Sequence, residues 1–230
     1  MGSAAVARMS SRTGPQTVPE AKRAIIREER HPLHWLPNAL TVSRILAVPA
    51  LVAGILTTAA IERVGWLVPW RATLGLFLLC MATDFLDGWL ARRWKLVSGF
   101  GRMIDPIADK LLVAGCLVAL SVVADGAWWL LAPALAVIGR DILVSGAREH
   151  AALSNIVMSP TRLAKWKTAF EMVAIAVLIV WTASRTWLPI GEGVATAQGV
   201  LFGLGIGALW LAAALSVWTG AGYVREALEG

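Results

Sequence analysis

The sequence predicts an all-α integral membrane protein with six transmembrane helices, preceded by a short N-terminal interfacial helix. Of its 230 residues, 57% are hydrophobic and 16% are charged, against about 25% charged residues in a typical globular domain. The mean hydropathy is +0.67, and apolar runs of the roughly 17–25 residues needed to cross a bilayer recur along the chain. These observations predict one membrane domain and leave no room for a second folded domain.

The N-terminal part of the chain is polar. Its first residues are small and polar and do not resemble a secretory signal, so they are expected to form a disordered tail. The segment EAKRAIIREER is highly charged around one apolar patch, which predicts an amphipathic helix on the membrane surface. The expected order is a tail over 1–18, an interfacial helix over 19–31, the membrane domain over 32–222 and a short cytoplasmic tail over 223–230.

Six apolar runs are long enough to cross the membrane. Many of the 12 Trp residues stand at the ends of these runs, where an interfacial aromatic belt is expected. Gly199, Gly203 and Gly207 form a small-residue stripe in the last run, for which packing within the chain is preferred over a dimer contact. The predicted spans are 38–61, 71–92, 105–124, 127–147, 165–184 and 197–219.

Lys and Arg residues gather at one end of the predicted spans. Six of them precede the first span, and four follow each of the second and fourth spans, whereas the other connections hold few. Because an excess of Lys and Arg marks the cytoplasmic side, both termini are expected there. The net charge of +6 then reflects topology and contact with anionic lipid, and no nucleic-acid partner is expected.

Four carboxylates lie at the edges of two apolar runs, on the predicted cytoplasmic side. Asp84 and Asp87 are three residues apart and Asp105 and Asp109 are four apart, so each pair shares a helix face. A carboxylate beside hydrocarbon is costly unless it is paired or binds a cation. Mg²⁺ and Mn²⁺ take oxygen ligands, and two such ions can flank a phosphoryl group during its transfer. The Asp cluster, as these four residues are named, therefore predicts a site for two divalent ions and a phosphate.

Single members of the Asp cluster also have structural interpretations. Asp105 precedes Pro106, a pair that suits a helix N-cap and first turn. Asp109 can pair with Lys110 or Arg102. The arrangement of all four acids at membrane edges favours a metal site over these interpretations.

Several cations lie on the same side as the Asp cluster and are candidates for binding an acceptor phosphate. They are Arg140, Arg148, Lys165 and Lys167. Arg140 falls inside an apolar run, where an unpaired cation is costly, and the adjacent Asp141 is not expected to share its face. The other three equally suit membrane-flanking cations that contact lipid headgroups.

The first span carries three polar residues at three-residue spacing. Asn38, Thr41 and Arg44 share one helix face and are candidate contacts of the acidic site. Arg44 lies a turn or more into the membrane and needs a partner. That partner is either the acidic site with its ligands or another buried acid.

The Asp cluster forms part of a longer pattern, D-x2-D-G-x2-A-R-x8-G-x3-D-x3-D, the signature of the CDP-alcohol phosphotransferase family. All eight fixed positions and their spacings are present, and the chain resembles this family over most of its length. Three further segments are similar to members of the family that use sn-glycerol 3-phosphate. They are LPNALTVSRI in the first span, GRDILVSGAREH at 139–150 and LAKWKTAFEM at 163–172. Two positions depart from those members, with Asp141 in place of Glu and Glu171 in place of Gln. The signature residues are Asp84, Asp87, Gly88, Ala91, Arg92, Gly101, Asp105 and Asp109.

The resemblance implies a reaction and its participants. The phosphatidyl group of CDP-diacylglycerol would pass to sn-glycerol 3-phosphate with release of CMP, in a homodimer of six-helix subunits in the bacterial cytoplasmic (inner) membrane. The Asp cluster would bind two divalent ions, Mg²⁺ or Mn²⁺, and Asp109 would also act as general base. The residues implied around the cytidine diphosphate are Asp84, Gly88, Ala91, Arg92 and Gly101.

Three alternatives remain. The same chemistry with inositol phosphate, serine or phosphatidylglycerol needs a different acceptor pocket, and the basic residues favour a phosphorylated acceptor over serine or a neutral lipid. A divalent-cation transporter predicts acids in the middle of spans and leaves Gly88 and Arg92 unexplained. A purely structural scaffold leaves the acids without compensation.

Overall fold

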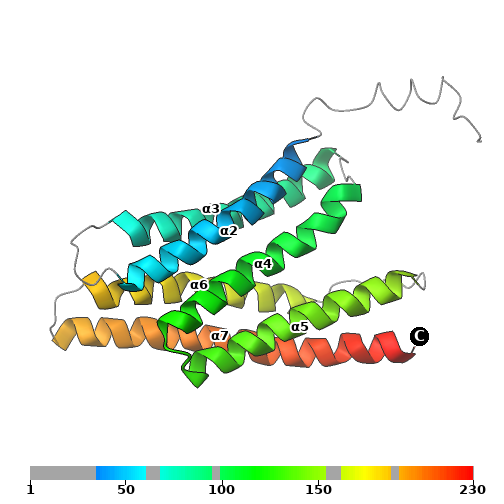
Figure 1. Cartoon of the computed structure of the whole chain (residues 1–230). Coiled ribbons are helices and arrows are strands. Elements are labelled where there is room, and N and C mark those ends of the chain that lie inside the picture. Colours follow the sequence, from blue (N-terminus) through cyan, green and yellow to red (C-terminus); the bar gives the residue numbers. More distant parts are fainter. Residues whose placement is uncertain (1–34, 61–67, 95–98, 154–161, 188–191, 230) are drawn as a thin grey trace, which may run out of the picture. The chain divides into compact units, whose positions relative to one another are not determined.

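The computed structural model describes an all-helical membrane domain (Figure 1). Each helix contains an apolar stretch of 20 to 30 residues, long enough to cross a bilayer. The predicted six-span fold is therefore confirmed, while the tail at 1–18 and the interfacial helix at 19–31 lie outside the described residues. The structure describes residues 35–60, 68–94, 99–153, 162–187 and 192–229. The helices are α2 (Leu36–Ala60), α3 (Val68–Trp94), α4 (Gly99–Val123), α5 (Trp128–Leu153), α6 (Arg162–Trp187) and α7 (Glu192–Glu229).

Helix α4 begins earlier than the sequence indicates. Its first residue is Gly99, so Asp105 and Pro106 lie inside the helix. The interpretation of Asp105 as an N-cap is therefore wrong, and its carboxylate is free to face a neighbouring helix. Proline is tolerated within membrane helices because neighbouring groups satisfy the backbone carbonyl that it leaves unpaired. At the other end of the chain, α7 continues to Glu229, through the segment expected as a cytoplasmic tail.

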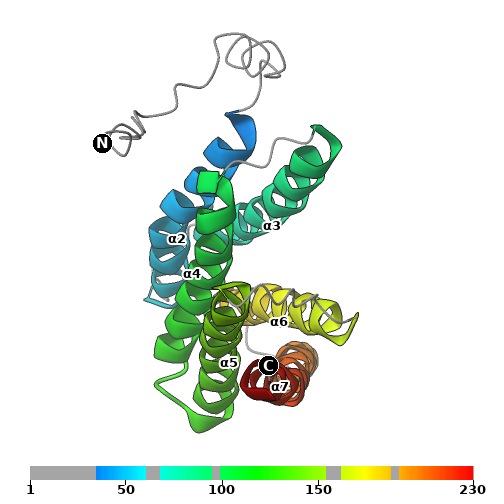
Figure 2. The same cartoon turned by 90° about the vertical axis from the view of Figure 1, so that its right-hand side faces the viewer.

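The helices pack as two groups of three. In the first group α2 contacts α3 and α4, and in the second α7 contacts α5 and α6; these are the most extensive helix interfaces. Figures 1 and 2 show the groups side by side, with α4 against α5 and α3 against α6. Successive helices run in opposite directions, so the end of α3 and the start of α4, which carry the Asp cluster, lie at the same end of the domain (Figure 1).

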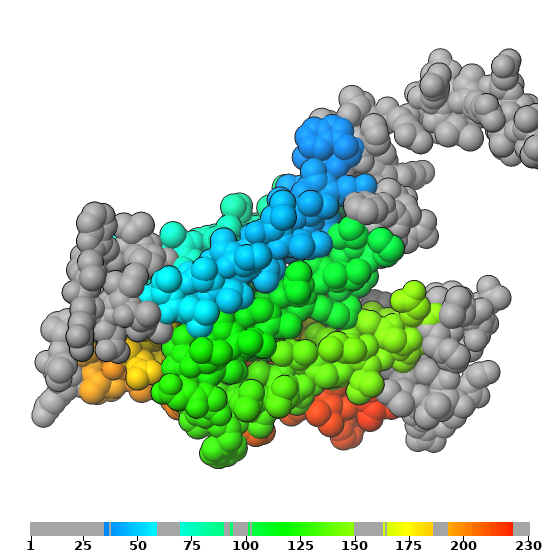
Figure 3. Space-filling model, in the orientation of Figure 1, coloured from blue at the N-terminus to red at the C-terminus, as the bar shows by residue number. Residues whose placement is uncertain are grey.

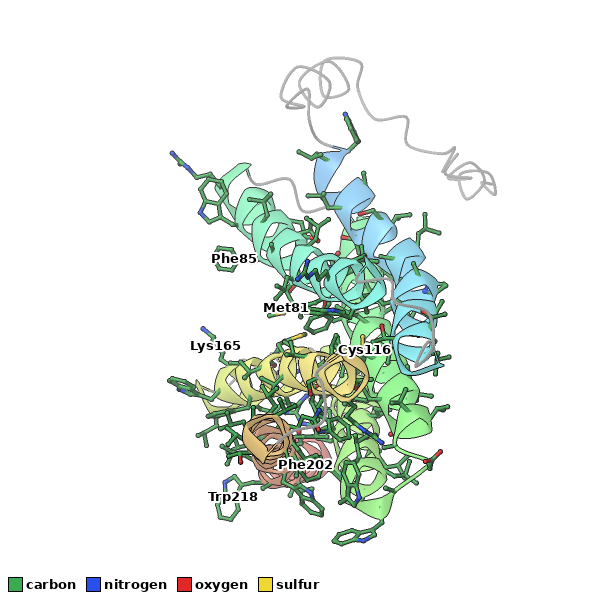
Figure 4. The ribbon with its side chains drawn as sticks, turned by 90° about the vertical axis from the view of Figure 1, so that its left-hand side faces the viewer. Met81, Phe85, Cys116, Lys165, Phe202 and Trp218 are labelled. Atoms are coloured by element: carbon green, nitrogen blue, oxygen red, sulfur yellow. The ribbon has the colours of Figure 1, made fainter. Side chains whose placement is uncertain are left out.

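An apolar core joins the two groups, and apolar side chains also cover the outside. Cys116 and Leu178 are fully buried, and Figure 4 shows Cys116 among the packed helices. Cys80 and Cys116 are both buried free thiols. Phe85 and Trp218 are 73% and 76% exposed. Such an outer surface suits contact with lipid.

In the part of the chain that the structure describes, the glycine stripe of α7 packs against no other helix, so the interpretation of it as packing within the chain is wrong. A side chain added at Gly199, Gly203 or Gly207 would meet no described atom within 4 Å. Gly205 of α7, in contrast, packs directly against α6, because an added Cβ would lie 2.9 Å from the Leu178 side chain. Gly205 therefore lets α6 and α7 approach closely, while Gly203 and Gly207 are exposed and Gly199 lines a cavity at the start of α7.

Candidate active site

Arg44 lies at the centre of the acidic site. Its side chain is fully buried, and its Nη1 lies 2.7 Å from both Asp84 Oδ1 and Asp109 Oδ1. Its Nη2 lies 2.6 Å from Asp87 Oδ2. One guanidinium therefore joins α2 to acids on α3 and α4, and the partner of Arg44 is the acidic site itself. The planar fork of arginine suits this role because its N–H groups can reach several carboxylates at once.

Thr41 connects the remaining acid. It lies one turn before Arg44 and is buried, and its Oγ1 donates a hydrogen bond of 2.6 Å to Asp105 Oδ1. Thr41 and Arg44 thus hold all four acids of the Asp cluster from one face of α2. Asn38, one turn earlier on that face, is half-buried.

The Asp cluster carries more negative charge than Arg44 compensates. One guanidinium faces four carboxylates, and the side chains of Asp84 and Asp109 are 47% and 49% exposed. Accessible carboxylate oxygens that lie close together are the ligands that Mg²⁺ and Mn²⁺ prefer. The chemistry of the donor set therefore fits divalent ions. In the described part of the chain, the acids converge on Arg44 and form no preassembled three-ligand cation site.

The other signature residues lie on the same two helices. Gly88 follows Asp87 on α3 and is half-buried, and Gly101 is buried in the first turn of α4. Ala91 and Arg92 belong to the last turns of α3. The contacts predicted for the side chains of these two residues lie outside the described part of the structure.

A second set of charged residues links α5, α6 and α7. Lys167 Nζ lies 2.8 Å from both oxygens of Asp141 and 2.6 Å from Glu171 Oε2. Arg140 Nη1 lies 3.1 Å from Asp141 Oδ1, and Arg140 Nη2 donates to Thr219 Oγ1 at 3.0 Å. The Arg140 network, as these five residues are named, contains two cations and two acids and is therefore close to neutral.

Asp141 is a direct ion-pair partner of Arg140, although the two adjacent residues were not expected to share a helix face. Adjacent helix positions point about 100° apart, but the long Arg140 side chain reaches round to a carboxylate that also binds α6. Asp141 and Glu171, the two departures from the family pattern, both compensate Lys167, which is 2% exposed. A buried ammonium needs such compensation.

Helix α7 accommodates Arg140 through a glycine. A Cβ added at Gly220 would lie 2.8 Å from Arg140 Cγ, so a larger residue would displace the arginine. No sequence pattern marks Thr219 or Gly220, because their role depends on α5 packing against α7. The spacing of four between Lys167 and Glu171, by contrast, is a signal that the sequence does carry.

The four predicted phosphate-binding cations do not form one cluster. Arg140 and Lys167 belong to the Arg140 network, and Arg148 is half-buried about two turns further along α5. Lys165 is exposed on α6 and projects outward (Figure 4). The positive charge on this side is therefore spread over two helices, and part of it is neutralised.

Lys110 stands between the two sets of charges. Its Nζ donates to the Pro106 carbonyl at 2.8 Å, and it interacts electrostatically with Asp109 on one side and with Asp141 and Lys167 on the other. Figure 3 shows the surface hollowed between α4 and α5 at this end of the helices. The Asp cluster and the Arg140 network therefore border one region.

Comparison with known proteins identifies the family. Residues 34–218 match the sequence model described as CDP-alcohol phosphatidyltransferase. The chain belongs to this family. This phosphatidyltransferase is thus an enzyme of phospholipid biosynthesis, and its six apolar helices make it a multi-pass membrane protein.

Relatives of this phosphatidyltransferase carry two different names. It is 36% identical to the CDP-diacylglycerol–glycerol-3-phosphate 3-phosphatidyltransferase of Cereibacter sphaeroides, over 85% of this chain and 97% of that protein. It is 37% identical to the protein of the same name from Rickettsia felis, over 83% of this chain and 93% of that protein. It is also 37% identical to the cardiolipin synthase (CMP-forming) of Oryza sativa subsp. japonica, over 98% of this chain and 67% of that protein.

Proposed function

We propose that this phosphatidyltransferase moves the phosphatidyl group of CDP-diacylglycerol to sn-glycerol 3-phosphate. The products are phosphatidylglycerophosphate and CMP. The observation that carries the proposal is the Asp cluster, held by Thr41 and Arg44. The family and the names of the relatives in C. sphaeroides and R. felis support the same reaction. The acceptor hydroxyl oxygen bonds to the phosphorus that carries the lipid, and the bond from that phosphorus to CMP breaks.

The Asp cluster would hold two divalent ions, Mg²⁺ or Mn²⁺. Bound there, such ions would neutralise charge on the phosphoryl oxygens during transfer. The contribution of α2 is to fix the carboxylates. Arg44 contacts one oxygen each of Asp84, Asp87 and Asp109, and Thr41 contacts one oxygen of Asp105, which would leave the second oxygen of each acid to a bound ion. Removing the α2 contacts would therefore disorder the ligands without removing any of them.

Asp109 is assigned as the general base. Its Oδ1 is engaged by Arg44, and half of its side chain is exposed, so its second oxygen can accept the proton of the acceptor hydroxyl. The cytidine diphosphate is assigned to the signature positions around the other acids. Gly88 would allow its close approach to the helix backbone. The assigned positions are Asp84, Gly88, Ala91, Arg92 and Gly101.

The acceptor phosphate is assigned to the basic side of the same region. Arg140 and Arg148 are eight residues apart on α5, so they lie near one helix face. Lys167 is held by two acids, so its contribution is to fix Asp141 and, through Asp141, the Arg140 side chain. Lys165 stands at the edge of the region and can attract the dianion before it binds.

The experiment that tests the proposal uses purified full-length protein, CDP-diacylglycerol, labelled sn-glycerol 3-phosphate and Mg²⁺ or Mn²⁺. Asp109→Asn is expected to reduce CMP release by about 10²–10⁴-fold, the usual contribution of a general base, with an unchanged melting temperature. Glu149→Gln, which changes an exposed acid on α5 outside the Asp cluster and the Arg140 network, is the matched control. Near-normal activity of Asp109→Asn would refute the assignment of the base.

Phosphatidylglycerol is the second candidate acceptor. Two observations favour it: the rice relative that matches 98% of this chain is named a cardiolipin synthase, and the Arg140 network is close to neutral, which weakens its attraction for a dianion. Offering both acceptors in the same assay decides between them. Label from glycerol 3-phosphate in the lipid fraction supports the first proposal, whereas CMP release only with phosphatidylglycerol supports the second.

The proposal also covers assembly and location. The protein would form a homodimer in the bacterial cytoplasmic membrane, with both termini and the active site on the cytoplasmic side. The exposed Gly203 and Gly207 of the α7 stripe offer a surface on which a second copy can approach closely. Light scattering of the purified protein measures its molar mass and so tests the dimer. Gly203→Leu should shift a dimer towards monomer, while a monomeric parent protein would refute it.

A further inference from the structure

A cavity lies at the end of the helices opposite the Asp cluster. Its volume is about 570 Å³, within the range of small-molecule sites. It lies where the turn between α4 and α5 meets the end of α6 and the start of α7. Along α4, the helical rise from Asp109 to Val123 is about 20 Å, so the cavity is separate from the proposed active site. Its lining residues include Asp125, Trp129, Trp181, Arg185, Gln198 and Phe202.

Three aromatic rings from three helices form the apolar wall of this cavity. The Phe202 ring lies edge-on to Trp129 with centroids 4.9 Å apart, and 5.2 Å from the ring of Trp181. Trp129 and Trp181 also meet edge-on at 6.2 Å. Figure 4 shows Phe202 projecting from α7 among the packed helices. Because each ring is held by the other two, the wall is preformed.

Three polar side chains lie around the aromatic wall. The Arg185 guanidinium lies over the Trp181 ring, with its Cζ 5.2 Å from the ring centroid, in a cation–π contact. Gln198 Nε2 donates to the Ser184 carbonyl at 2.7 Å, which orients the amide and leaves its Oε1 as an acceptor. The third side chain is the carboxylate of Asp125.

Asp125 adopts an uncommon backbone conformation at the cavity. Its φ is +52°, in the left-handed region, and Gly126 follows at +66°. Among residues other than glycine, Asn and Asp are the ones that tolerate this region best. The sequence therefore places a carboxylate at a position where glycine would be less strained.

We propose that this cavity binds the headgroup of a phospholipid that carries a primary amine. Arg185 is suited to the phosphate, and Asp125 and Gln198 Oε1 are suited to accept hydrogen bonds from the ammonium group. An anionic headgroup without an amine would bring negative charge towards Asp125. A quaternary ammonium has no N–H to donate. The aromatic wall would contact the glycerol and upper acyl carbons, at the depth where Trp is enriched in membranes.

The test measures lipid binding and not transfer. Purified full-length protein in detergent would be titrated with dioleoyl phosphatidylethanolamine and, separately, with the glycerol and choline lipids of the same chains, with bound lipid counted by native mass spectrometry. Free phosphoethanolamine, added as competitor, distinguishes recognition of the headgroup from a requirement for the whole lipid. The variants are Arg185→Gln and Asp125→Asn. The matched control is Arg71→Gln, because Arg71 stacks on Trp70 at 5.5 Å at the same end of the helices, outside the cavity.

The amine lipid is expected to bind about tenfold more tightly than the other two, and each cavity variant to lose about tenfold, the effect of one charge-assisted hydrogen bond. Arg71→Gln should bind like the parent protein. Equal affinity for the three lipids, or parent-like binding by both cavity variants, would overturn the proposal. If Arg185→Gln does not fold, Asp125→Asn decides, because asparagine keeps the left-handed conformation. Transfer activity is measured separately, so failure of the proposed reaction would leave this result intact.

Discussion

Arg44 and Asp87 form a buried ion pair, with Nη2 and Oδ2 2.6 Å apart and side-chain exposures of 0% and 9%. Because both groups are withdrawn from water, removing one leaves the other as an uncompensated buried charge, which costs about 3–5 kcal/mol. The pair also ties α2 to α3 at the place where the acids converge. Stability and activity are therefore expected to depend on the same contact.

Replacing Arg44 by lysine tests this dependence. Lysine keeps the charge, but its single ammonium group cannot reproduce the two-nitrogen fork that binds Asp84, Asp87 and Asp109. We expect CMP release to fall about 100-fold, which corresponds to the loss of one or two charge-assisted hydrogen bonds, and the melting temperature to fall with it. Arg71→Lys is the control at the opposite membrane edge. Parent-like activity of Arg44→Lys would show that charge alone suffices.

The hydrogen bond from Thr41 to Asp105 can be removed with almost no change in shape. Thr41→Val deletes the donor, whereas Thr41→Ser keeps it. The valine variant should lose about tenfold in CMP release, the effect of a hydrogen bond to a charged group, and the serine variant should retain most of it. Titration of Mg²⁺ in the same assay should show a higher requirement for the valine variant alone. Equal activity of the two variants would contradict a role for Thr41 in placing Asp105.

Substitution of Lys167 tests whether this residue has a structural role or binds substrate. In the Arg140 network it neutralises Asp141 and Glu171, so Lys167→Met should destabilise the protein by about 3–5 kcal/mol. Glu171→Gln should be much milder, because Lys167 keeps Asp141 as partner. Thermal unfolding in detergent measures both. If Lys167→Met instead raised only the KM for glycerol 3-phosphate and left stability unchanged, Lys167 would be a direct phosphate ligand.

Gly220 and Gly222 provide a matched pair on α7. Gly220→Ala would place a methyl group against Arg140 and move its guanidinium, while Gly222→Ala would meet no described atom within 4 Å. If Arg140 binds the acceptor phosphate, the first variant should raise the KM for glycerol 3-phosphate about tenfold, the effect of one charge-assisted hydrogen bond. The second should leave it unchanged. Steady-state kinetics over a range of acceptor concentrations checks this, and equal KM values would remove Arg140 from the acceptor site.

Much of the fold could be predicted from the sequence because it depends on local composition. The length of each apolar run must match the bilayer, which is why six spans were predictable. The observed helices extend beyond these runs where the chain becomes more polar, most of all at the end of α7, which reaches Glu229, at the end of α5 and at the start of α4. The start of α4 also changes the interpretation of a residue. Asp105 and Pro106 look like a helix start in isolation, but the helix extends back to Gly99.

The sequence by itself determined which residues are the candidates for the chemistry. The spacing of the Asp cluster puts its members on shared helix faces, and hydrocarbon makes unpaired acids there too costly to be incidental. Only the tertiary structure decided their partners. Arg44 reaches acids on α3 and α4 because α2 packs against both of these helices. Arg140 binds Thr219 as well as Asp141 because α7 packs against α5. Spacing along one helix cannot predict such contacts, since they depend on which helices become neighbours.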